Sequence, residues 1–207
     1  MWKSNLSKYL SKLSKKHNFK FIQISTDAFY LGRKFKLNRE TDKLFAINNY
    51  AKTKLLAEKF VNKNRKSLII RTNFTGREFK KDSKRFIDWI YRTIRKKNKI
   101  KLFHDMYIST IDVKTCAKTV IDLVLTNASG IYNLGTKDAV SKMEFAIKFS
   151  KKINKKLKYQ GISCDDNTQT PRNKNLGLNV SKIEKKLNWK MINSNQAISN
   201  LAKEYWW

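Results

Sequence analysis

Two short stretches of this chain constrain its fold more than any others. Ser25-Thr26-Asp27 follows an apolar run, residues 19–24, which predicts a short buried strand ending in polar side chains. Tyr50-Ala51-Lys52-Thr53-Lys54 opens an amphipathic stretch that predicts a helix over residues 49–63. Tyr50 and Lys54 are four residues apart, so they lie one turn apart on the same helix face. A hydroxyl, a phenol and an amine arranged in this way are suited to proton transfer, because an ammonium stabilises a nearby phenolate.

The remaining pattern predicts an α/β fold. Residues 67–72 form an uninterrupted apolar run, typical of a parallel strand covered on both faces. Residues 100–103 and 130–135 predict further strands. Helices are expected from residue 82, at 112–125, at 141–153, at 181–187 and at 195–205. Ser141 is expected to cap the third of these, with Glu144 completing a capping box. The side chains expected to face inward on the helix at 112–125 are Val113, Ala117, Val120, Ile121 and Val124. Residues 28–48 and 161–176 predict loops, and a basic N-terminal helix is expected to pack on the strand that follows it.

The order of these motifs resembles the extended short-chain dehydrogenase/reductases, and within them the dTDP-4-dehydrorhamnose reductase branch. The resemblance lies in an ordered set that includes Ser25-Thr26-Asp27, Glu40-Thr41-Asp42, Asn48, Tyr50-x-x-x-Lys54 and Glu58, followed by Leu68-Ile69-Ile70-Arg71-Thr72-Asn73. It implies part of a Rossmann-like parallel sheet with a small α/β substrate-binding lobe. Residues 1–76 would form the C-terminal part of the NAD(P)-binding domain. Residues 77–207 would form mainly the lobe, with some elements returning to the sheet.

The resemblance also implies roles for individual residues in reducing the keto group of a nucleotide-linked sugar. Tyr50 would protonate the developing alkoxide, and Thr26 would hydrogen-bond the carbonyl oxygen. Lys54 would hold the nicotinamide ribose, and Ser25 and Tyr50 would also contact the NADP or NAD cofactor. Asp27 and Asn73 would contact the substrate, although from the residues alone Asp27 is equally suited to capping a turn and Asn73 to ending a strand.

A Gly-rich turn, which lets backbone amides approach a dinucleotide pyrophosphate, is not found in these 207 residues. The chain has six glycines, none in a GxGxxG or GxxGxxG pattern. We therefore expect a truncated reductase. It is either a fragment that needs a separately encoded N-terminal half or self-association to complete the site, or a decayed copy of the enzyme. The strand before Ser25 would then present an open apolar edge. Ala28, where the family has an aromatic residue, leaves the identity of the sugar open.

The charge is strongly basic, with 46 Lys and Arg against 16 Asp and Glu, a formal net charge of +30. This balance suits phosphate-bearing partners such as nucleotides, nucleic acid or anionic membranes. The favoured explanation is the codon bias of an AT-rich genome, which enriches Lys, Asn and Ile together, because the basic residues are spread along the chain. The best nucleic-acid cluster is Arg92, Arg95, Lys96, Lys97 and Lys99, but no RNA-binding motif accompanies it, so nucleic acid is not the expected partner.

Cysteine and histidine usage gives no metal site. Cys116 and Cys164 form no metal-type pair, and His17 and His104 are isolated. The N-terminus lacks the apolar core of a signal peptide, and no apolar run is long enough to span a membrane. These features predict a cytoplasmic protein. The alternative function, from another class, is a non-catalytic protein of this ancestry that binds a sugar nucleotide, a reductase subunit or nucleic acid.

Overall fold

A three-stranded parallel sheet organises the larger half of the structure, a computed structural model that describes residues 2–32, 36–78, 83, 85–166 and 173–205. Its strands are β1 (Ile22–Thr26), β2 (Leu68–Thr72) and β7 (Gly130–Leu134), in the order β1-β2-β7. All five residues of β2 are buried, as expected of a strand that is covered on both faces. The predicted α/β fold with a parallel sheet is therefore confirmed.

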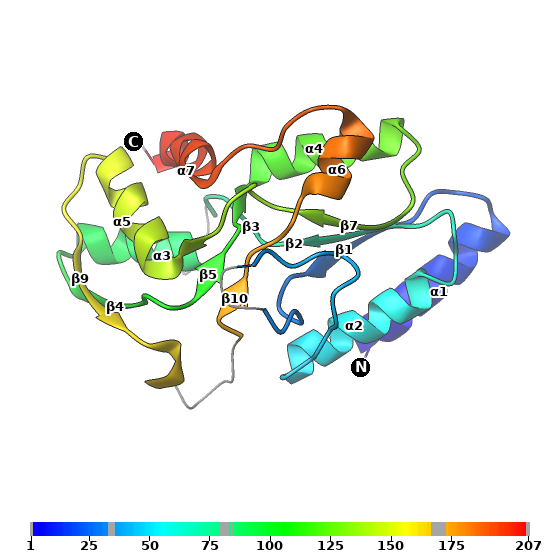
Figure 1. Ribbon diagram of the computed structural model, residues 1–207, viewed down its shortest axis with the longest axis horizontal. Coiled ribbons are helices and arrows are strands. Elements are labelled where there is room, and N and C mark those ends of the chain that lie inside the picture. The colour runs from blue at the N-terminus through cyan, green and yellow to red at the C-terminus, as the bar shows by residue number, and fades with distance from the viewer. Residues whose placement is uncertain (1, 33–35, 79–82, 84, 167–172, 206–207) are drawn as a thin grey trace.

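Helices cover both faces of this sheet (Figure 1). On one face lie α1 (Trp2–Lys16) and α2 (Asn49–Val61), packed against each other. On the other lie α4 (Val113–Leu125) and α6 (Ser181–Leu187). The predicted contact between α1 and the following strand is a minor one: α1 packs mainly on α2 and reaches β1 through a 2.8 Å hydrogen bond from Ser7 to Gln23.

The inward face of α4 differs from the one predicted. The structure buries Cys116, Thr119 and Leu123, whereas Ile121 is 57% exposed and Ala117 also faces solvent. Thr119 is tolerated inside because its hydroxyl donates to the Thr115 carbonyl at 2.8 Å. Val120 and Val124 are partly buried and pack against the core, as predicted. The prediction is wrong for Ala117 and Ile121, and it omitted the buried residues Cys116, Thr119 and Leu123.

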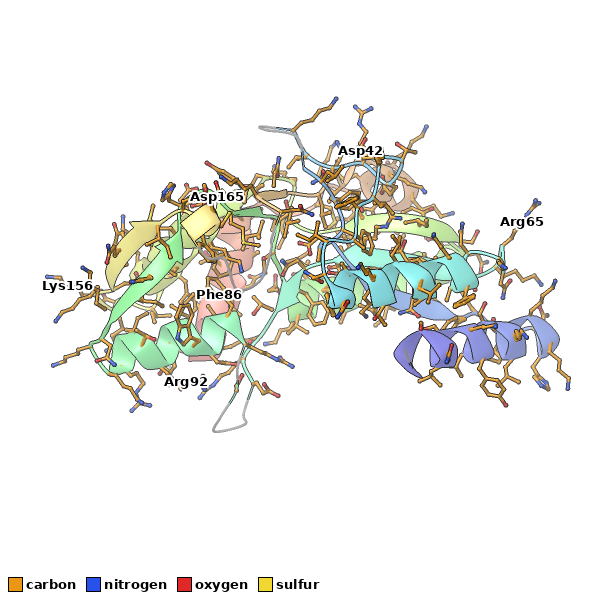
Figure 2. All side chains as sticks on the ribbon, turned by 90° about the horizontal axis from the view of Figure 1, so that it is seen from below. Asp42, Arg65, Phe86, Arg92, Lys156 and Asp165 are labelled. Atoms are coloured by element: carbon orange, nitrogen blue, oxygen red, sulfur yellow. The ribbon has the colours of Figure 1, made fainter. Side chains whose placement is uncertain are left out.

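A second, smaller lobe carries the other elements (Figures 1 and 2). In it α3 (Phe86–Arg95) leads to β4 (Lys99–Phe103), and α5 (Lys142–Lys152) leads to β9 (Lys158–Ile162). β4 and β9 pair in parallel, and α7 (Ser194–Ala202) packs against α5. The core between them is made of apolar side chains that include Ile87, Ile90, Leu102, Phe145, Phe149, Ile198 and Leu201.

Short strands connect the lobe to the sheet. β3 (Phe74–Thr75) pairs with β6 (Ile111–Asp112), and β5 (Tyr107–Ile108) lies between β8 (Val140–Ser141) and β10 (Asn175–Leu176). The prediction of a loop over residues 161–176 is wrong at both ends, which belong to β9 and β10. Strand β9 reads Lys-Tyr-Gln-Gly-Ile and is mostly exposed, so it has no apolar alternation to reveal it. Residues 167–172 lie outside the described part.

Side-chain caps mark two helix starts, of which the one at Ser141 was predicted. Asn48 caps α2, accepting a 2.9 Å hydrogen bond from the Ala51 amide. Ser141 and Glu144 form the predicted capping box at the start of α5. Among the described residues no helix combines the length and apolar character needed to cross a bilayer.

Candidate active site

The polar ends of β1 and β2 meet at one edge of the sheet. Thr26 and Thr72 are paired in the parallel register, which brings Asp27 and Asn73 side by side. Asn73 Nδ2 donates to Asp27 Oδ2 at 3.0 Å, and Thr26 Oγ1 lies 3.4 Å from Asp27 Oδ1. Burial raises the pKa of Asp27 to about 6, although the hydrogen bond from Asn73 opposes the shift. The structure thus brings together three of the residues singled out in the sequence.

Helix α2 brings Lys54 to the same strand. Lys54 Nζ donates a 3.0 Å hydrogen bond to the Ile24 carbonyl, two residues before Thr26. Tyr50 lies one turn earlier, in the first turn of α2, and its side chain is 58% exposed. Lys54 is therefore held at β1, whereas Tyr50 is exposed and makes no hydrogen bond with Thr26, Asp27 or Asn73.

Ser25, the remaining predicted cofactor residue, lies inside β1. Its hydroxyl is buried and has no hydrogen-bond partner among the described residues. A buried hydroxyl without a partner is energetically costly. The ammonium of Lys54, the phenol of Tyr50 and the hydroxyl of Ser25 are hydrogen-bonding groups of the kind that the nicotinamide end of a dinucleotide requires. The residues of the chain offer no Gly-rich turn for its pyrophosphate.

A cavity of about 370 Å³ opens beside Asn73, between the sheet edge and the lobe. Phe74 and Phe86 give it apolar walls, and Arg85 and Lys142 give it positive charge. The charge of Lys142 also acts on Asp27, lowering its pKa against the larger effect of burial. None of these four residues was predicted from the sequence. Only Phe74 could have been predicted, because it directly follows Asn73 at the end of a strand, where ligands bind in α/β folds; it is 44% exposed.

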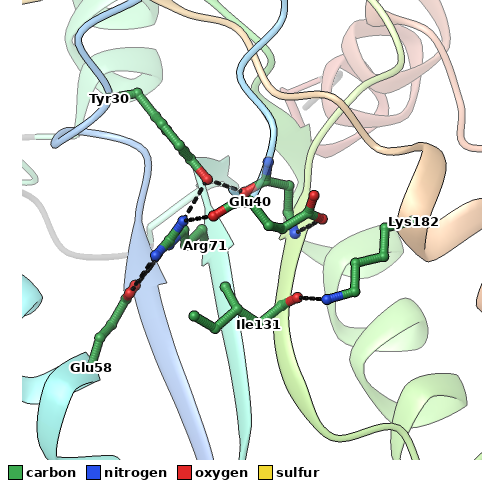
Figure 3. Close-up of polar contacts among 7 residues, drawn as sticks. Tyr30, Glu40, Glu58, Arg71, Ile131 and Lys182 are labelled. Carbon is green, nitrogen blue, oxygen red and sulfur yellow. Dashed lines mark hydrogen bonds and ion pairs between the residues drawn. The ribbon is translucent and has the colours of Figure 1, made fainter. Parts of the chain in front are cut away.

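A buried polar network fixes α2 and the loop over residues 28–48 to the sheet (Figure 3). Arg71 of β2 pairs with Glu58 of α2 at 2.8 Å. Arg71 also donates to the Tyr30 hydroxyl at 2.8 Å and to the Glu40 carbonyl at 2.9 Å. Tyr30 in turn donates to Asn133 Oδ1 at 2.8 Å. Burial raises the pKa of Tyr30 to about 12, so its phenol remains a donor at neutral pH.

Metal-binding chemistry finds no support in the described part of the chain, where no three His, Cys, Asp or Glu side chains cluster in a way that would hold an ion. The polar groups of the site are instead hydroxyls, an amide, a carboxyl and an ammonium. These groups are suited to orienting a carbonyl and moving a proton.

Comparison with known proteins places this architecture among the Rossmann-like α/β folds. The crystal structure of dTDP-4-dehydrorhamnose reductase from Bacillus anthracis in complex with NADP superposes with a TM-score of 0.88 at 21% identity, covering 96% of this chain and 70% of that one. The corresponding enzyme from Yersinia enterocolitica gives a TM-score of 0.84 at 16% identity, covering 96% and 71%.

The family itself is shown by sequence. The model of the RmlD substrate-binding domain matches residues 3–206, and the chain belongs to this family. A relative, the probable low-salt glycan biosynthesis reductase Agl14 of Haloferax volcanii, is 26% identical over 172 residues. That match covers 81% of this chain but 57% of the relative, so the chain spans little more than half of the relative's length.

Proposed function

We propose that this chain forms the catalytic and substrate-binding part of an NAD(P)H-dependent sugar-nucleotide reductase of the dTDP-4-dehydrorhamnose reductase type. The observation that carries the proposal is the convergence of Thr26, Asp27, Asn73 and Lys54 on the end of β1, beside a positively charged cavity. Arg85 and Lys142 in that cavity suit the phosphates of a nucleotide-linked sugar. Residues 1–76 would serve mainly the cofactor and residues 77–207 mainly the substrate.

The reaction proposed is reduction of the 4-keto group of the sugar. Reduced nicotinamide, when bound, supplies the hydride. Thr26 donates a hydrogen bond to the carbonyl oxygen, and Tyr50 gives its phenolic proton to that oxygen as the carbonyl carbon is reduced, leaving an alcohol and a phenolate. Lys54, now bonded to the Ile24 carbonyl, would stabilise the phenolate and would hold the nicotinamide ribose.

The free edge of β1 supports a proposal about the cofactor. Among the described residues β1 pairs only with β2, so no strand covers its other edge. We propose that a βαβ unit with a Gly-rich turn, on the same polypeptide or on a separate one, pairs with this edge and binds the pyrophosphate of NADP or NAD. Association of two copies of the chain through β1 is the competing way to cover the edge.

The experiment is titration of the purified chain with NADPH, followed by cofactor fluorescence, with and without an added Gly-rich βαβ unit. Tyr50→Phe and Lys54→Ala are compared with Lys52→Ala, which removes the same charge from an exposed position of the same helix. Binding that Lys54→Ala weakens and Lys52→Ala does not supports the site. Consumption of NADPH with a nucleotide-linked 4-keto sugar, abolished by Tyr50→Phe, supports the reaction.

The second candidate function is a non-catalytic binding protein with the same ancestry. The observation that favours it is the exposure of Tyr50, which has no hydrogen bond to any described residue. This candidate predicts binding of the sugar nucleotide alone, with equal affinity in the Tyr50→Phe variant and no NADPH consumption even when the βαβ unit is added.

A further inference from the structure

A second basic region lies at the far end of the lobe, away from the candidate active site. Helices α3 and α5 each end in a short basic turn and lead into β4 and β9. The parallel pairing of β4 with β9 sets Lys99 opposite Lys158, so the two basic segments lie side by side. Figure 2 shows Lys156 at this end of the molecule, with Arg92 on the nearby helix α3. We call residues 95–101 and 151–158 together the basic tip.

The charge of the basic tip is much denser than that of the chain as a whole. Ten of its fifteen residues are Lys or Arg and none is acidic, whereas 46 of 207 are basic in the whole chain. A genome-wide bias toward Lys codons enriches all exposed segments alike and does not explain this concentration. The ten are exposed, and no ion pair in the described part of the chain involves them: Arg95, Lys96, Lys97, Lys99, Lys101, Lys151, Lys152, Lys155, Lys156 and Lys158.

A hollow of about 690 Å³ lies within the basic tip, a volume that suits a small-molecule ligand. Arg95 and Lys97 line one side of it, Lys152 and Lys155 line the other, and Tyr91 and Tyr205 contribute aromatic surface. Four cations without an acidic partner in the lining repel one another, and an anion bound among them would offset this repulsion.

Helix dipoles account for only a small part of this charge. Both α3 and α5 end here, and each C-terminus carries roughly half a negative charge, which cations in the last turn offset. Two helix ends therefore balance about one of the four lining cations. The lysines of β4 and β9 lie beyond the helices altogether. The remaining positive charge is balanced neither by the helix dipoles nor by an acidic side chain of the lining.

Lys97 provides an independent indication. It adopts a left-handed backbone with φ of 55°, which disfavours most side chains. The other non-glycine residues with positive φ in the described part of the chain are all asparagine: Asn18, Asn127, Asn154 and Asn188. Asn154 occupies the matching position at the end of α5. The hollow therefore has a lysine at a position where asparagine or glycine would adopt the left-handed backbone at a lower cost in free energy.

We propose that this hollow binds a ligand with clustered phosphate groups, at a site separate from the candidate active site. The cations from the ends of two helices surround the phosphates, and the exposed lysines of β4 and β9 raise the local anion concentration. The shared chemistry is a group of closely spaced phosphates, carried either by a free polyphosphorylated molecule or by the headgroups of an anionic lipid surface.

The test uses the whole chain and two probes: inorganic tripolyphosphate, and vesicles of phosphatidylcholine with and without phosphatidylinositol phosphate. The hollow variant combines Arg95→Gln, Lys97→Asn, Lys152→Gln and Lys155→Gln. The control variant combines Lys12→Gln, Lys16→Gln, Lys59→Gln and Lys63→Gln, which removes the same charge from exposed positions on and beside α1 and α2. Binding is measured by calorimetry or vesicle co-sedimentation at several salt concentrations.

We expect the hollow variant to bind at least one probe more than about tenfold more weakly, and the control variant to stay within about threefold of the unmodified chain. Binding to tripolyphosphate identifies a free ligand, and binding only to phosphoinositide vesicles identifies a lipid headgroup. Equal losses in the two variants, or no binding of either probe near physiological salt, would overturn the proposal.

Lys97→Asn alone gives a second test that does not depend on the folding of a quadruple variant. Because asparagine adopts the left-handed conformation more readily, the substitution is expected to raise Tm, by about 2 °C, while weakening tripolyphosphate binding. Opposite effects on stability and binding support a ligand-binding role. A rise in Tm with unchanged affinity for both probes would remove Lys97 from the site and contradict the proposal.

Discussion

Glu58 of α2 and Arg71 of β2 form a buried, two-pronged ion pair, in which Arg71 Nη2 and Nε donate to the Glu58 carboxylate at 2.8 Å and 3.2 Å. The side chains are 4% and 3% exposed respectively. Burial by itself lowers the pKa of Arg71, but the hydrogen bonds and the charge of Glu58 raise it above the ordinary value. The pair fixes α2, one turn after Lys54, at a defined height on the sheet.

Removing one partner of this pair is expected to leave a buried charge uncompensated. Arg71→Met should therefore lower the free energy of unfolding by about 3–5 kcal/mol, measured by urea denaturation. Lys118→Met, which breaks an exposed i,i+4 pair with Asp122 on α4, is the control and should change it by about 0.5 kcal/mol or less. The double variant Glu58→Met/Arg71→Met should be more stable than Arg71→Met alone; a double variant that is less stable contradicts this interpretation.

Asp27 predicts a pH dependence of stability. Its pKa is about 6 in the folded protein against 3.8 for the free side chain, so the folded state binds the proton more tightly. Stability is therefore expected to fall as pH rises from about 4 to 6, by about 3 kcal/mol in total from this group. Asp27→Asn keeps an oxygen that accepts from Asn73 and should remove that loss. Urea denaturation at pH 4 and 7.5 measures most of it, and an unchanged pH profile in the variant would show that another group is responsible.

Cys116 should be unreactive while the protein is folded. The thiol is buried, which raises its pKa to about 11, so only about one molecule in a thousand carries the thiolate at pH 8. Burial also raises the pKa of Cys164. We expect mass spectrometry to detect little iodoacetamide labelling of native protein and two labels after unfolding in urea. Rapid labelling of the folded chain would instead indicate local opening around α4.

The capping box at the start of α5 makes a smaller, local prediction. Ser141 Oγ accepts from the Glu144 amide at 3.1 Å, and the Glu144 carboxylate accepts in return from the Ser141 amide. Ser141→Ala should lower the free energy of unfolding by about 1 kcal/mol, and Tm by about 2–4 °C. Ser199→Ala, a half-buried position within α7 where the hydroxyl donates to the Asn195 carbonyl, is the control. An equal change in the two variants would mean that the cap contributes nothing beyond loss of a hydroxyl.

Much of the local structure could be predicted because its causes lie within a few residues of one another. An apolar run specifies β2, and the Ser141–Glu144 spacing specifies the start of α5. The four-residue spacing of Tyr50 and Lys54 places them on one face of α2. The ordered motifs around them also identified the family correctly. The prediction failed where the local pattern carried no signal, as in the polar strand β9 and on the inward face of α4.

Relationships between distant segments were decided only by the tertiary structure. Arg71 reads in the sequence as part of an apolar strand, and its pairing with Glu58 and Tyr30 depends on how α2 and the loop over residues 28–48 fold over the sheet. The cavity beside Asn73 combines residues from four separate segments. The two halves of the basic tip are about fifty residues apart in sequence and meet only because β4 pairs with β9. Periodicity and capping act over one or two turns of chain, whereas burial, charge pairing and cavity shape depend on which surfaces pack together.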